Sequence, residues 1–213
     1  MWALINEDNS IAEIIRFPRS ITINNVKHPR AIFTKWSWSE LNAIGIYEVL
    51  DNGVKGNDFF EYTSQPTWTF NASDNNVTSS YTVTDKTLTD TNNVDEDGNA
   101  ITDYKGNQTV TLGLKSIAKE KAKQQANSLI KPFNWLVERL AYDSSKTIPS
   151  AVGTYVGDIK TDCAAIEAAI DGASNMTAFK ALYQDTIDSD GNVTEVARVN
   201  RWTDDYDVKT YIR

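Results

Sequence analysis

Residues 114–130 read LKSIAKEKAKQQANSLI, and apolar side chains recur in them at every third or fourth position. This spacing predicts an amphipathic α-helix. The pattern continues to Leu140, which extends the predicted stripe to about seven helical turns. Pro132 interrupts the stripe, and since proline cannot donate a helical hydrogen bond we expect a kink or a break near Leu129. The stripe consists of Leu114, Ile117, Ala118, Ala122, Ala126, Leu129, Ile130, Phe133, Leu136, Val137 and Leu140.

A second helical pattern follows after a short polar connection. It starts at Thr147-Ile-Pro149-Ser150, where proline suits the first turn, and ends at Gly172. A short link between two such helices predicts an antiparallel αα-hairpin. A brief third helix, over about residues 177–183, is expected to be capped by Asn175 or Ser174. Residues 111–185 are therefore predicted to form a helical hairpin plus this short helix.

The first 110 residues carry strand patterns instead. Short alternating segments between turn residues predict a small antiparallel meander or sandwich. One short helix is expected near residues 38–45. Ser37 or Ser39 can cap it, Ser37 and Glu40 have the spacing of a capping box, and Gly45 suits a helix end. Residues 84–109 are rich in Thr, Asp and Asn, and they are interpreted as an exposed hairpin or loop between the halves.

The last segment, residues 186–213, contains the turn Asp188–Gly191 and two further strand-like stretches. It is expected to be an extended or small β tail. The predicted fold class is therefore α+β, with an N-terminal antiparallel β-rich domain, a C-terminal α-helical hairpin and a short extended tail.

Charge and hydropathy exclude several kinds of partner. Lys and Arg number 21 and Asp and Glu number 29, which gives a net charge of −8. An acidic chain repels nucleic-acid phosphate and anionic lipid, so we expect neither nucleic acid nor membrane as a partner. No apolar run approaches the roughly 18 residues that cross a bilayer, and the first residues predict no secretory signal. The basic excess in residues 114–142 is interpreted as a solvated helix face.

The residues that usually carry chemistry are sparse. His28 and Cys163 are the only histidine and cysteine, and no phosphate-binding or nucleophile-elbow motif occurs. The loop that starts at Asn93 resembles the opening of an EF-hand, but its twelfth position is Tyr104 where a carboxylate is needed. The loop around Asp188 fails in the same way, at Ala197. We therefore expect no catalytic residue, no metal site and no cofactor, and a chain that is not an enzyme.

Three tryptophans are candidate contact residues. Trp36 and Trp38 alternate, which places both on one side of an extended segment, and Trp68 lies in a predicted strand. Such rings can stack on a glycan or dock a protein partner. The other interpretation of Trp36 and Trp38 is that they close the core over the neighbouring short helix.

Two stretches resemble a known class of protein. Leu114–Lys119, Asn134–Arg139 and Thr147–Ile159 resemble a region of phage tail-fibre and tail-fibre-assembly proteins, with Val156 in place of the usual arginine. Near the N-terminus, Ile21-Thr-Ile, His28-Pro29, Ile32-Phe33, Trp36-Ser37 and Gly45–Val49 are similar to openings of short marine-phage tail proteins. Together the two stretches cover about half the chain.

The resemblance implies a location and a role, and no reaction. It implies a structural protein of the phage tail, made in the host cytoplasm and built into the virion as a fibre-proximal or baseplate adaptor. Its partners would be other tail proteins and copies of itself, in a trimer or ring. The alternatives are a fibre-assembly chaperone absent from the virion, or a carbohydrate- or receptor-binding module.

Overall fold

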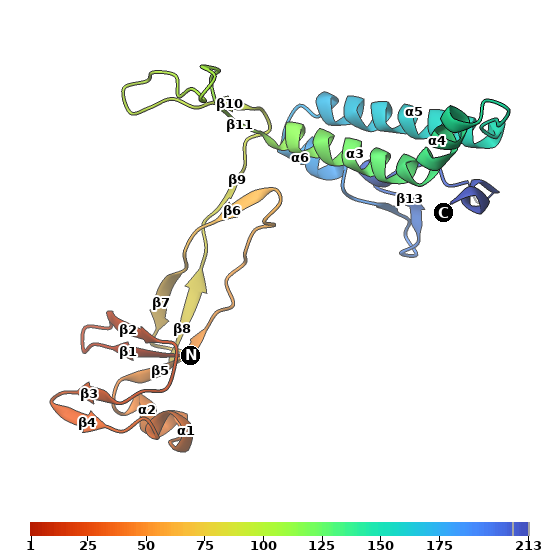
Figure 1. Ribbon diagram of the computed structural model, residues 1–213. Helices are drawn as coiled ribbons and strands as arrows, with labels where there is room; N and C mark the ends of the chain where they lie inside the picture. The colour runs from red at the N-terminus through yellow and green to blue at the C-terminus, as the bar shows by residue number, and fades with distance from the viewer. Residues whose placement is uncertain (206, 213) are drawn as a thin grey trace. The chain divides into compact units, whose positions relative to one another are not determined.

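The computed structural model describes residues 1–205 and 207–212. The chain is an α+β protein that divides into two compact units, residues 1–85 (unit 1) and residues 86–213 (unit 2). Figure 1 shows the elements of both units. The boundary differs from the expected one near residue 110, because residues 86–90 are bonded to the start of the long helix. The N–H of Leu114 donates to the Thr87 carbonyl at 2.9 Å, and that of Gly113 to the Asp90 carboxylate at 2.8 Å.

Unit 1 is built on a five-stranded sheet of order β2-β1-β5-β8-β7. Its strands are β1 (Trp2–Ile5), β2 (Ile11–Ile15), β5 (Ile46–Leu50), β7 (Thr67–Asn71) and β8 (Asn76–Ser80). Apolar side chains cover both faces of the sheet. Trp2 and Leu4 of β1 pack on one cluster, with Ile46, while the alternate residues Ala3 and Ile5 belong to a second, with Val77.

The sheet is mixed, which corrects the expectation of a purely antiparallel one. β1 pairs antiparallel with β2 and with β5, and β7 with β8, but β5 and β8 run parallel. Polar contacts hold the segment after β5 against the end of β8. The hydroxyl of Ser79 donates to Asp51 at 2.7 Å, that of Tyr81 donates to the same oxygen, and the N–H of Gly53 donates to Ser79 Oγ at 2.9 Å. These contacts link residues distant in sequence, so local patterns do not reveal them.

Short elements complete unit 1. They are the hairpin β3 (Ile21–Ile23) with β4 (Val26–His28), the pair β6 (Glu61–Thr63) with β9 (Val83–Asp85), and helices α1 (Ile32–Lys35) and α2 (Trp38–Asn42). The capping box at the start of α2 is confirmed: Ser37 Oγ accepts from the Glu40 N–H, and the Glu40 carboxylate accepts from the Ser37 N–H at 2.7 Å. One helix was expected here. The second, α1, follows a turn at Pro29 and buries Ile32 and Phe33.

Unit 2 contains the two long helices. Its helical elements are α3 (Leu114–Ile130), the 3₁₀ turn η1 (Lys131–Phe133), α4 (Asn134–Tyr142), α5 (Ser150–Gly172) and α6 (Met176–Ala181). The break at Pro132 is confirmed as a 3₁₀ turn. α3 and α5 are antiparallel, since Lys119 near the start of α3 pairs with Asp171 at the end of α5, while Phe133 packs on Tyr155 near its start.

The last segment, expected to be an extended or small β tail, packs on these helices. It forms the hairpin β12 (Thr186–Ile187) with β13 (Val193–Glu195) and the 3₁₀ turns η2 (Arg198–Asn200) and η3 (Asp207–Tyr211). Val208 is 1% exposed and joins the core of Phe133, Leu136 and Ile159. The indole N–H of Trp135 donates to the Tyr211 carbonyl at 3.0 Å. Buried apolar residues therefore anchor this segment to the helices.

Residues 91–111 form an exposed hairpin that precedes α3. β10 (Thr91–Asn92) pairs with β11 (Val110–Thr111), and isolated bridges join Val94 to Ala100 and Thr102 to Gln108. Among the described helices, none is long and apolar enough to span a membrane.

Candidate functional site

The three predicted contact tryptophans lie in two settings. Trp36 ends α1 and Trp38 begins α2, and they are 38% and 41% exposed. Neither is among the residues of the two described core clusters of unit 1. The ring of Trp36 lies edge-on to His28, with centroids 5.8 Å apart. Trp68 is half-buried in β7 and packs on the cluster of Val49 and Val77. Trp36 and Trp38 are thus open to a partner, whereas Trp68 contributes to the core.

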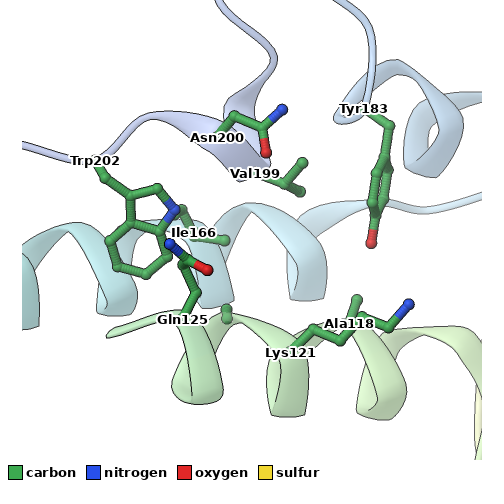
Figure 2. Close-up of a pocket in the computed structure, with 9 residues that line it drawn as sticks. Ala118, Lys121, Gln125, Ile166, Tyr183, Val199, Asn200 and Trp202 are labelled. Atoms are coloured by element: carbon green, nitrogen blue, oxygen red, sulfur yellow. The ribbon is translucent and has the colours of Figure 1, made fainter. Parts of the chain in front are cut away.

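A pocket of about 440 Å³ lies in unit 2, between α3, α5 and the segment that follows β13. Figure 2 shows Trp202, Asn200, Val199 and Tyr183 above α5, and Lys121 and Gln125 on α3. The spacing of the four α3 residues explains this arrangement, because steps of three and four residues keep them on one face of a helix. The lining residues are Ala118, Lys121, Ala122, Gln125, Ile166, Tyr183, Val199, Asn200 and Trp202.

The floor of the pocket is apolar and its rim is polar. Ala118, Ala122 and Ile166 are buried, whereas Gln125 and Asn200 are exposed. The side-chain amides of Gln125 and Asn200 have no hydrogen-bond partner among the described residues. Tyr183 is half-buried, and this burial raises the pKa of its hydroxyl to about 12. A tyrosine hydroxyl is protonated near neutral pH even without this shift, and in that form it has the capacity to donate and to accept a hydrogen bond.

The backbone after β13 fixes the upper wall of the pocket. The N–H of Val199 donates to the Leu182 carbonyl at 3.2 Å, which joins η2 to the end of α6. The N–H of Ala197 donates to the Asp185 carboxylate at 2.7 Å. Thr203 is hydrogen-bonded to Asp162 of α5. Trp202 therefore lies between two residues that are bonded to the helices, Val199 before it and Thr203 after it. The wall is thus built by specific bonds to α5 and α6.

A second surface feature is an apolar groove where α4 meets the start of α5. Its volume is about 290 Å³, and it is lined by Ile130, Phe133, Asn134, Leu136, Val137, Ile148, Val152, Gly153, Val156 and Lys160. Val137 is 57% exposed, and Leu140, one turn further along α4, is 37% exposed. Exposed aliphatic side chains beside an open groove are typical of a protein-contact surface.

A stripe of small side chains on the outward face of α5 continues from this groove. A methyl group added at Gly153 or Gly157 would meet no heavy atom within 4 Å. Neither glycine therefore has a packing role within the chain, although glycine inside a helix costs about 1 kcal/mol relative to alanine. This small face consists of the exposed residues Ser150, Gly153, Thr154, Gly157, Thr161, Ala164 and Ala168.

The acidic loops considered for calcium form a repeated turn. Asp95, Asp103 and Asp188 each begin an Asp-x-x-Gly-Asn sequence, and each accepts N–H bonds from residues two and four positions ahead. The glycines of these turns have φ of +83° to +85°, a conformation that glycine adopts without strain. These bonds, above all the backbone bond from the asparagine, lower the pKa of each carboxyl. The carboxylates therefore serve to close the turns.

His28 and Cys163 lie in separate units. His28 ends β4 beside Trp36, while Cys163 is half-buried on α5, and its burial raises the pKa of the thiol. Over residues 1–205 and 207–212, no three His, Cys, Asp or Glu side chains are grouped so that they could hold a metal ion.

Sequence reasoning missed the pocket. Trp202 and Asn200 were assigned to a final strand or tail, and only the packing of that segment brings them to α3. The one sequence feature that could have indicated it is on α3, where the spacing places Ala118, Ala122 and Gln125 on one face of the helix. In the structure the two alanines of this face are buried. Comparison of the chain with known proteins found no match among protein-family models, curated proteins or solved structures.

Proposed function

We propose that the chain is a structural component of a bacteriophage tail, a fibre-proximal or baseplate adaptor that acts through protein–protein contacts and is not an enzyme. The sequence resemblance described above suggests the location. The division into two compact units suits an adaptor, because each unit has its own core and can present its own contact surface. In this proposal the chain is made in the host cytoplasm and retained in the virion.

The observation that carries the proposal is the continuous surface formed by the apolar groove and the small face of α5. Val137 and Leu140 project from α4 beside the groove, and Gly153 belongs to both features. Aliphatic side chains supply the free energy of docking, because each loses contact with water when a partner covers it. Small residues permit another helix to approach closely, as in coiled coils of Ala-rich helices.

The same surface is proposed to join copies of the chain into a trimer or a ring. A helix face without side-chain bulk suits repeated contacts around a symmetry axis. Lys160 borders the groove, whereas the exposed Asp158 points to a different side of α5, because residues two positions apart on a helix do not share a face. The two edges of the surface therefore carry opposite charges. Opposite charges at a rim favour one register between copies.

Two alternative functions are each supported by a specific feature of the structure. An assembly chaperone would use the same groove transiently and would be absent from the finished particle. A carbohydrate- or receptor-binding module would use the exposed rings of Trp36 and Trp38. Loss of glycan-array binding on Trp36→Ala and Trp38→Ala, with Tyr104→Ala as an exposed aromatic control, would favour that module.

Mass spectrometry of purified virions tests the proposal. Peptides of this chain should be found in the particle, in a copy number that matches the tail symmetry. Absence from the particle, together with presence in the infected-cell lysate, would replace the structural role by that of an assembly chaperone.

A further inference from the structure

We infer that the exposed hairpin of residues 91–111 in one copy of the chain docks on a basic patch, residues 14–39 of unit 1, in a second copy. The inference goes beyond the proposed function, because neither the apolar groove nor the small face of α5 takes part in this contact. It joins two different surfaces, and a head-to-tail contact of this kind builds a ring where the rotation between copies closes.

The hairpin forms no core of its own. None of residues 91–111 is buried, and of these only Asn93 and Thr109 are half-buried. A two-stranded hairpin without a packed face is marginally stable in water. A partner that covers its apolar side chains therefore stabilises it. These side chains are exposed, and they are Val94, Ile101, Val110 and Tyr104, the last of which is 92% exposed.

The charge of the hairpin selects the kind of partner. Four carboxylates and one lysine give a net charge of −3, and they belong to Asp95, Glu96, Asp97, Asp103 and Lys105. The side chains of Glu96 and Asp97 are exposed and have no partner among the described residues. Like charges that face each other across an interface are unfavourable, so a second hairpin is a poor partner and a basic surface is a good one.

The basic patch is the complementary surface within the same sequence. Residues 14–39 contain five Lys or Arg and no acidic residue, although the whole chain carries a net charge of −8. Arg19 is paired with Glu13, whereas the other four cations are exposed and have no ion-pair partner among the described residues. These four are Arg16, Lys27, Arg30 and Lys35.

Contacts between the elements bring the patch together at one end of unit 1. Ile15 of β2 pairs with Trp2, whose ring packs on Phe33 of α1 with centroids 5.0 Å apart. Ile21 of β3 pairs with His28 of β4. Ile15, Ile21 and Phe33 belong to one core cluster. The segments that carry the cations therefore surround a single core, and Figure 1 shows β3, β4, α1 and α2 side by side.

Exposed aromatic rings stand among these cations. Phe17 follows Arg16 and is 79% exposed, and Trp36 follows Lys35. Tryptophan, phenylalanine and arginine are enriched at the centres of protein–protein interfaces, which favours a protein partner for this patch. The patch thus offers apolar area to the exposed aliphatic and aromatic side chains of the hairpin, and cations to its two unpartnered carboxylates.

Photo-crosslinking of the full-length chain tests the inference. Isotopically heavy protein carrying Tyr104→p-benzoylphenylalanine is mixed with light wild-type protein, treated with nuclease and irradiated. Mass spectrometry should find heavy–light crosslinks that join the hairpin to residues 14–39. The same replacement at Tyr142, which is 93% exposed on α4, should give no crosslink to these residues.

Charge reversal supplies the second arm of the experiment. Glu96→Lys with Asp97→Lys in the heavy copy, or Lys27→Glu with Arg30→Glu in the light copy, should each lower the crosslink yield by about five- to tenfold. The two variants mixed together should restore the yield, because opposite charges then face each other again. Glu7→Lys in the heavy copy changes an exposed carboxylate outside the hairpin and should leave the yield unchanged. All these side chains except that of Glu7 lie in the two docking surfaces and are exposed, so circular dichroism should stay as in the wild type.

Val137→Asp separates this contact from the one proposed for the groove. That substitution should leave the crosslink in place, because the groove takes no part in it. The hairpin contact should dissociate during size exclusion, since exposed ion pairs are weak, whereas crosslinking captures it. Heavy–light crosslinks that are absent or fall outside residues 14–39 would overturn the inference. A yield that charge reversal leaves unchanged, or that the mixed variants fail to restore, would also overturn it.

Discussion

Thr203 donates both its backbone N–H and its hydroxyl to one carboxylate oxygen of Asp162, and the donor–acceptor distance is 2.7 Å in each hydrogen bond. The two residues are 41 positions apart, so the bond closes the C-terminal segment onto the middle of α5. Trp202 immediately precedes Thr203, and it packs on the helical core. This carboxylate therefore holds the Trp202 end of the upper wall of the pocket, in addition to the bonds that Val199 and Ala197 make further back along the chain.

Asp162→Ala should loosen that wall. Hydrogen bonds to an ionised group contribute about 1.5–3 kcal/mol each when buried, and partial exposure reduces this, so we expect a loss of about 1–2 kcal/mol in the unfolding free energy. Urea unfolding measures the loss, and limited proteolysis should cleave earlier near residue 203. Asp158→Ala, one turn earlier on the exposed face, should change the free energy by less than about 0.5 kcal/mol. Equal effects of the two substitutions would contradict this role.

Asp51 should make the stability of unit 1 depend on pH in the acid range. Bonds from Tyr81 and then from Ser79 hold the pKa of this carboxyl below its usual value of 3.8. A depressed folded-state pKa gives stability that is present above the unfolded pKa and is lost as pH falls through the folded one. Thermal unfolding followed from about pH 5 down to about pH 2 should therefore show a falling midpoint.

Asp51→Asn is the matching control for that pH dependence. An amide cannot ionise, so the variant should be less stable at neutral pH and should lose less on acidification. An acid profile as steep as that of the wild type would assign the pH dependence to other carboxylates of unit 1.

The two units should respond separately to core substitutions. Ile46 is fully buried in unit 1 and Phe179 in unit 2. Ile46→Ala should cost about 2–5 kcal/mol and Phe179→Ala about 3–5 kcal/mol, each through lost burial and a residual cavity. Hydrogen exchange resolves the units, because each substitution should increase amide exchange only in its own unit. Increased amide exchange in both units of either variant would show that the two cores unfold together.

Gly157 tests whether the small face of α5 is free of contacts within the chain. Gly157→Ala should raise the unfolding free energy by about 0.5–1 kcal/mol, because alanine is the better helix former and the space is open. Gly98→Ala also meets open space, but φ is +85° there, so it should give no gain. Chemical unfolding at low protein concentration measures both. A loss of stability in Gly157→Ala would mean that the face is already packed.

The sequence predicted elements set by local chemistry and missed those set by distant contacts. The Ser37 capping box, the break at Pro132, the Asn175 cap of α6 and the end of α5 at Gly172 all depend on residues within one or two helical turns. The parallel pairing of β5 with β8 follows a long excursion through β6 and β7, and the alternation within each strand does not tell which other strand it pairs with.

The same limit explains the missed pocket and boundary. Trp202 lies far from Gln125 in sequence, and only the Asp162–Thr203 bond and the burial of Val208 bring its segment to the helices. The assignment of residues 86–110 to unit 2 rests on backbone bonds from Leu114 and Lys115 to the chain before the hairpin. Exposure of Trp36 and Trp38, in contrast, was one of two alternatives that the alternation left open.

The mass of the purified protein in solution tests most directly that the exposed surface of unit 2 joins copies of the chain. Light scattering coupled to size exclusion should give a trimer or a larger ring for the wild type and a monomer for Val137→Asp, which places a charge in the apolar groove. Val54→Asp, on an exposed valine of unit 1, should assemble as the wild type does. A wild-type monomer at every concentration, or a Val137→Asp variant that assembles unchanged, would contradict the account.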